Sequence, residues 1–122
     1  MEAQRVDERD SSWEDDAPRF RVYLFERGRG GDYAVTDTWD ITGADVLEAI
    51  RWAQDRAGRD GLYAVAVVRD ELKLDDEHPS RGLVWLVGMD WHDDVAEDVD
   101  GQRTKERMIA RRGQAVVAAE PP

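Results

Sequence analysis

The sequence predicts a single α+β domain, in which a four-stranded sheet with the chain order β-β-α-β-β carries one main helix on one face and a short C-terminal helix. Three observations support this fold class. The length of 122 residues suits one domain with one core. Four short apolar segments have the spacing of strands, and the segment between the second and third has the spacing of a helix.

We expect the ordered α+β domain to span residues 19–112, between a tail at 1–18 and a second tail at 113–122. The first tail carries many more carboxylates than arginines and little that could be buried. Such a composition does not support a packed core, so we expect this tail to be disordered.

The first two strands are indicated by alternation with period two. Residues 20–26 place apolar side chains on both faces, and residues 33–41 alternate between an apolar and a polar face. The glycine-rich, basic loop 27–32 lies between them. A phosphate-binding loop leads from a strand into a helix, whereas this loop leads from strand to strand. We therefore expect a plain hairpin loop.

The main helix has the clearest local signals. Thr42 is the expected N-cap, with Asp45 returning a hydrogen bond to it in a capping box, and Gly58 is the expected terminator. One face carries apolar residues at helical spacing. These residues are Val46, Ile50, Ala53 and Ala57.

Two later segments, 62–68 and 83–89, are apolar on both faces, which is typical of interior strands. An acidic loop at 71–81 connects them. Residues 102–112 contain good helix formers but only Met108 and Ile109 as large apolar side chains, so we expect a short or frayed helix.

These elements leave an imbalance between apolar surface and cover. One helix covers one face of the sheet, while the interior strands are apolar on both faces and the C-terminal segment is polar. An exposed apolar face of several hundred Å² would be unusual in a monomer. We therefore expect a homodimer or a protein partner packed on that face.

Charge and cysteine content restrict the partners and the compartment. A formal charge of −11 repels phosphate backbones and anionic lipid, so we expect no direct nucleic-acid or membrane binding, whereas a basic partner is attracted. The chain has no cysteine, which excludes disulfides and thiolate chemistry and suits the reducing cytoplasm. The preference for arginine over lysine suggests a bacterial, GC-rich origin.

One segment resembles a metal site. Asp90, His92 and Asp94 follow an expected interior strand, and the acidic loop supplies a second imidazole, His78. Zinc or iron would need both histidines, which the two ends of a hairpin could bring together. The spacing does not match a calcium loop. A metal-dependent enzyme built on these residues is one hypothesis, although acidic loops with an incidental histidine are common.

Other catalytic patterns are weak. The serines lie in the expected tail or follow a proline in a loop, and no nucleophile elbow occurs. A pair of acidic residues carries no information in a chain with 28 carboxylates. We therefore expect a chain that is not an enzyme and holds no cofactor.

Three tryptophans are candidate binding residues. Trp52 lies off the apolar face of the expected helix, Trp39 lies on the second strand, and Trp91 lies at a loop mouth beside His92. Tryptophan is enriched at interface hot spots. The alternative is that each indole simply packs against its neighbours.

From Pro18 to about Val68 the layout resembles the N-terminal part of the ArdA-type antirestriction proteins. The shared features are Pro18 before Arg-Phe-Arg-Val-Tyr-Leu, a Gly-Arg-Gly turn, Trp39-Asp40, a helix with Val46 and Ile50, and a strand with Tyr63-Ala64-Val65. The resemblance implies an acidic mimic of DNA that acts on a restriction or regulatory protein, and it assigns no functional residue. Mimicry requires rows of carboxylates at about the spacing of phosphates.

The leading hypothesis is a non-catalytic interaction domain that self-associates or binds a protein partner. The surfaces expected to mediate it are the apolar sheet face and the aromatic positions Trp39, Trp52 and Trp91. The DNA mimic and the metal-dependent enzyme are the alternatives.

Overall fold

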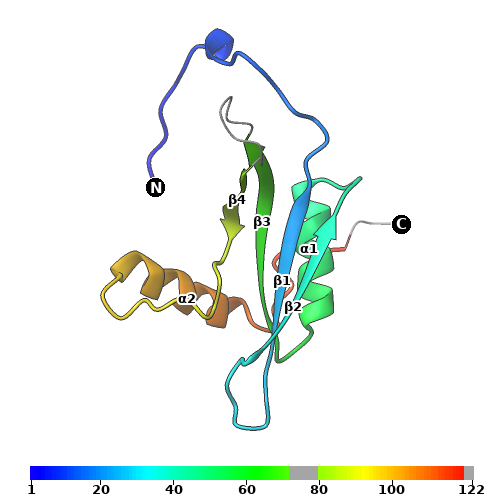
Figure 1. The fold of residues 1–122 in the computed structure, drawn as a ribbon, viewed down its shortest axis with the longest axis vertical. Helices are drawn as coiled ribbons and strands as arrows, with labels where there is room; N and C mark the ends of the chain where they lie inside the picture. The colour runs from blue at the N-terminus through cyan, green and yellow to red at the C-terminus, as the bar shows by residue number, and fades with distance from the viewer. Residues whose placement is uncertain (72–79, 120–122) are drawn as a thin grey trace.

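The computed structural model describes residues 1–71 and 80–119. The four strands of this part of the chain form one antiparallel sheet with the spatial order β2-β1-β3-β4 (Figure 1). The α+β class and the four-stranded sheet are therefore confirmed. The elements in chain order are a 3-10 turn η1 (Glu8–Asp10), β1 (Phe20–Glu26), β2 (Val35–Ile41), α1 (Val46–Ala57), β3 (Leu62–Glu71), β4 (Ser80–Val87) and α2 (Val99–Arg111).

Strands β1 and β3 are the interior strands of the sheet, whereas β4 is an edge strand, so the expectation that residues 83–89 form an interior strand was wrong. Strand β1 pairs with β2 on one side and with β3 on the other, both antiparallel, so β2 and β3 run in the same direction and α1 connects them across β1. The hairpin of β3 and β4 contains one irregularity. Its register shifts between Val65 and Ala66, which places one extra residue in β4 just before Val87.

The first core cluster lies between α1 and one face of the sheet. Alternate residues of the central strands point toward the helix, as period two requires. The buried members are Phe20, Val22, Leu24, Ala49, Ile50, Ala53, Tyr63 and Val65. A segment of the expected C-terminal tail also packs here, because the side-chain amide of Gln54 donates to the Val117 carbonyl at 2.6 Å and accepts from the Val117 amide at 3.0 Å.

The start of α1 differs from the expectation. The N-cap is Asp45 rather than Thr42: its carboxylate accepts from the Glu48 amide at 2.8 Å, and the Glu48 carboxylate accepts from the Asp45 amide at 3.1 Å. Gly43 has a φ of +69°, so the chain turns before the helix begins. The late start leaves Val46 in the first turn, 37% exposed. Gly58 ends the helix as expected.

The second face of the sheet is partly covered, which corrects the expected imbalance. Helix α2, longer than predicted, buries Met108 against Phe25, Leu62 and Ala64. Tyr33, expected in the second strand, instead leaves the hairpin and joins this second cluster, 6% exposed. A few apolar side chains from the flanking loops therefore help to cover the second face. The mostly polar sequence of the C-terminal helix gave no indication of this cover.

The N-terminal segment runs away from the sheet over the end where β1 begins (Figure 1). Residues 1–17 are exposed. Trp13 makes one contact with the sheet, since the guanidinium of Arg69 lies 5.4 Å from its ring centroid. No helix in the described ranges is long and apolar enough to span a bilayer.

Candidate functional site

Two of the three predicted tryptophans meet on the α1 side of the sheet. Trp39 of β2 and Trp52 of α1 pack edge to face, with ring centroids 5.7 Å apart and an interplanar angle of 65°. The guanidinium of Arg56, one helical turn beyond Trp52, lies 4.9 Å from the Trp39 ring centroid and 5.3 Å from the Trp52 ring centroid. We call Trp39, Trp52 and Arg56 the tryptophan patch.

The patch is ordered by its neighbours and remains accessible. The Trp39 indole N–H donates to the Asp37 carboxylate at 2.8 Å, and the Trp39 side chain is still 39% exposed. Trp52 is half-buried against the first core cluster. A fixed, accessible indole beside a fixed guanidinium is the composition that is enriched at the centres of protein interfaces.

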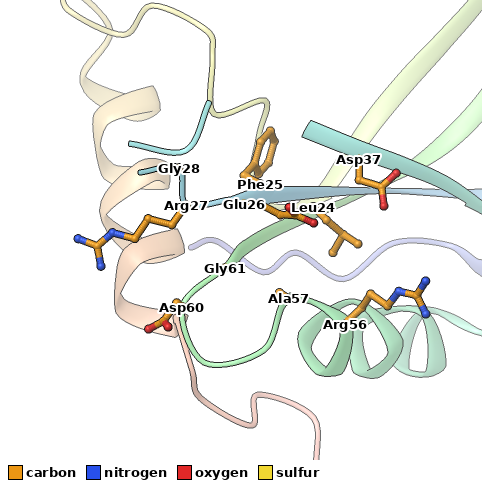
Figure 2. A pocket seen from close by; sticks show the side chains of 10 residues that line it. All are labelled: Leu24, Phe25, Glu26, Arg27, Gly28, Asp37, Arg56, Ala57, Asp60 and Gly61. Carbon is orange, nitrogen blue, oxygen red and sulfur yellow. The ribbon is translucent and has the colours of Figure 1, made fainter. Parts of the chain in front are cut away.

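A cavity of about 580 Å³ lies next to the patch, between the end of β1 and the C-terminal end of α1 (Figure 2). Arg56 and Asp37 line one end of it, and Arg27 and Asp60 lie toward the other end. The lining therefore carries both signs of charge. Such a cavity suits a charged side chain of a partner, bound beside an aromatic surface.

The glycine-rich loop at the edge of this cavity is a hairpin turn, as expected. The amide of Gly28 donates to the Asp32 carbonyl at 2.6 Å, and the amide of Gly31 donates to the Gly28 carbonyl at 3.0 Å. Arg27 donates to the Gly31 carbonyl at 3.2 Å. The loop bonds to itself and leads into β2, which is not the geometry of a phosphate-binding loop.

The third predicted tryptophan lies on the opposite face of the sheet. Trp91 packs edge to face on Tyr33, with ring centroids 5.6 Å apart, and the ammonium of Lys105 lies 5.1 Å from its ring centroid. It is a partly buried member of the second cluster. The structure therefore joins Trp39 with Trp52 and separates Trp91 from both.

The predicted metal ligands have other contacts. His92 Nε2 and the Thr36 hydroxyl are hydrogen-bonded at 2.9 Å. The His92 ring packs on Phe25 with ring centroids 5.8 Å apart. Asp90 accepts from the His92 amide at 3.0 Å, and Asp94 accepts from the Ala96 amide at 2.9 Å. His78 lies outside the described residues. Within residues 1–71 and 80–119, no three potential ligands are grouped for a metal.

The uncovered part of the second face carries a row of charges that sequence reasoning missed. We call it the charge ladder, and its signs alternate across all four strands. Its ion pairs are Arg21–Asp40 at 2.7 Å, Arg19–Asp40 at 3.6 Å, Arg19–Asp70 at 3.6 Å and Arg81–Asp70 at 2.8 Å. Arg19 and Arg21 already show the spacing of one strand face, but only strand pairing brings the five charged residues together. Carboxylates alternating with arginines are not the row of carboxylates that mimicry of DNA requires.

The ladder changes the titration of its carboxylates. The hydrogen bonds that Arg21 donates hold the pKa of Asp40 below its usual value, and the hydrogen bond that Arg81 donates does the same for the pKa of Asp70. A carboxylate with a lowered folded-state pKa stabilises the fold above its unfolded-state pKa of about 3.9, and this stabilisation is lost as the pH falls toward the folded-state value.

We therefore expect the free energy of unfolding to fall in acid, starting near pH 4, and to fall less steeply for Asp40→Asn. Urea unfolding of both proteins between neutral pH and pH 2 measures this difference. Identical pH profiles for the two proteins would contradict the role assigned to Asp40.

Comparison with known proteins gave no match, whether with protein families, curated proteins or solved structures. The resemblance to the ArdA-type proteins therefore stays a prediction.

Proposed function

We propose that this chain is a non-catalytic interaction domain that binds a protein partner through the tryptophan patch. The observation that supports it most directly is the accessible Trp39 ring, which packs on Trp52 and under Arg56. Tryptophan and arginine are the residues most often found at hot spots. A binding surface that is already ordered loses little conformational entropy when a partner docks.

The polar groups around the patch support a binding role rather than a chemical one. Asp37 holds the Trp39 indole, and Arg56 lies over two rings, so each charged group is engaged in positioning an aromatic side chain. The adjacent cavity offers both signs of charge to a side chain of the partner. The net charge of −11 favours a partner with a basic surface.

The test is quantitative capture from an extract of the source cells on immobilised chain. We expect Trp39→Ala to reduce capture of the bound partner at least about tenfold, as the loss of a hot-spot side chain does. Arg56→Gln should also reduce capture of the same partner, because the substitution removes the guanidinium that lies over both indoles.

The matched control is Trp13→Ala, which removes an indole of the tail that is 66% exposed. This variant should capture the partner as well as the wild-type chain does. Equal capture by the wild-type, Trp39→Ala and Arg56→Gln proteins, all verified as folded by circular dichroism, would rule out the patch as the binding surface.

A further inference from the structure

We propose that the chain forms a homodimer by antiparallel pairing of β4 with β4 of a second copy, which joins the two sheets into one. Strand β4 is the last strand of the sheet on its side, and no described helix or strand lies along its outer edge (Figure 1). The tryptophan patch involves β2, at the opposite edge, so this proposal and the proposed function fail independently.

The outer edge of β4 presents backbone groups in the arrangement that strand pairing requires. The amide of Val68 donates to the Arg19 carbonyl, so its backbone points toward β1, and the backbone of Val67 points toward β4. Val67 pairs with Val84. By the same alternation, Leu83 and Trp85 point their N–H and C=O groups outward, where a second strand can bond to them.

The side chains of this edge lack the usual protection against pairing. Residues 82–89 contain no charged residue, although charged residues make up 37% of the chain. Val84 is 48% exposed and Leu86 is 44% exposed. Edge strands are normally protected by charges, proline, a β-bulge or cover from another element. The bulge of β4 lies at Leu86, beyond the Leu83–Trp85 segment that would pair. An uncharged, apolar edge of this kind favours addition of a strand.

The opposite edge of the sheet, strand β2, is protected by charged residues. Strand β2 carries two aspartates among its seven residues, with Asp37 on one face and Asp40 on the other. Pairing of β2 with β2 of a second copy would place four aspartates in one pair of strands, which is less favourable than pairing two uncharged segments. The two edges therefore differ in the property that decides self-pairing.

A second copy fits the edge of β4 better than an unrelated strand because the edge is self-complementary. With the two-fold axis at Val84, the two Val84 side chains face each other, and Leu83 of each copy lies opposite Trp85 of the other. Every one of these contacts is apolar. Each copy carries a charge of −11, so an uncharged strip is the surface where two copies repel each other least.

Light scattering on the purified chain tests the proposal. We expect about twice the chain mass of 13.9 kDa for the wild-type protein, and the single-chain mass for Val84→Lys, in which two lysines would face each other across the axis. The control is Val35→Lys, which places the same charge on β2 at a valine that is 51% exposed, and which should remain dimeric.

Two results of this measurement would overturn the proposal. One is a wild-type chain that keeps the single-chain mass up to about 1 mM, the weak end of measurable association. The other is a Val84→Lys protein that stays dimeric.

Cross-linking keeps the test decisive should Val84→Lys fail to fold. The chain has no cysteine, so Val84→Cys introduces a single thiol. The backbone of Val84 points toward β3, so the pair across the axis is a non-hydrogen-bonded one with Cα atoms about 4.5 Å apart, within disulfide range. Mild oxidation should yield a disulfide-linked dimer from Val84→Cys and not from Val35→Cys. Equal cross-linking of the two variants would overturn the assigned edge.

Discussion

Phe25→Ala is expected to lower the free energy of unfolding by about 3–5 kcal/mol, the range for removing a fully buried aromatic ring. Phe25 is 0% exposed and lies in the second core cluster. Its ring stacks on Tyr23 with centroids 6.2 Å apart and meets the edge of the His92 ring at 5.8 Å. The substitution leaves a cavity at the point where α2, β1 and the loop after β4 come together.

Guanidinium unfolding monitored by circular dichroism measures this loss. The matched control is Val35→Ala on the same hairpin, where the side chain is 51% exposed and the expected change is within about 0.5 kcal/mol. Hydrogen exchange adds a local measurement, because amides of α2 should lose more protection than amides of α1. A loss below about 1 kcal/mol, too small for a large cavity, would show that Phe25 does not anchor the second cluster.

Gly88→Ala is expected to cost about 2–4 kcal/mol, from a left-handed backbone and an overpacked contact together. Gly88 has a φ of +73°, which side chains rarely adopt. An added Cβ would lie 3.0 Å from the Ala64 Cβ and 3.2 Å from the Tyr63 carbonyl oxygen. These atoms belong to buried residues near the start of β3, which have little room to move.

The same unfolding experiment measures the effect of Gly88→Ala. The control is Gly30→Ala in the loop between β1 and β2, where nothing lies within 4 Å of an added Cβ and the expected change is within about 0.5 kcal/mol. Equal free energies of unfolding for the two alanine variants would mean that the left-handed turn at Gly88 does not contribute to the stability of the fold. Gly88 directs the chain from β4 toward the loop that carries Trp91 and His92, so we also expect Gly88→Ala to loosen α2.

Phe25→Ala and Gly88→Ala both disturb the packing that covers the second face of the sheet. The sequence did not reveal how this face is covered. Residues 102–112 are mostly polar, and the helix buries only one large apolar side chain, Met108. The rest of the cover comes from Tyr33, Met89 and Trp91 in loops. A loop residue has no periodicity to mark it as buried, so counting apolar faces of helices and strands underestimates the cover.

The proposed site was only partly predictable for a related reason. Trp39 and Trp52 were each identified from their positions in a strand and a helix, but their contact depends on how α1 crosses the sheet. Trp91 has the same residue type and was identified at a loop mouth, yet it lies on the other face. Residue type indicates which side chains favour an interface, and packing decides which of them share one.

The amino-acid sequence by itself determined the α+β class, the first strand, the helical face around Ile50 and Ala53, and the termination of α1 at Gly58. These features depend on interactions between residues a few positions apart, which periodicity records. Tertiary structure alone decided which strands are edges, how α2 covers the second face, and that Trp39, Trp52 and Arg56 form one patch. These outcomes depend on contacts between residues far apart in the chain, whose energies only the assembled fold defines.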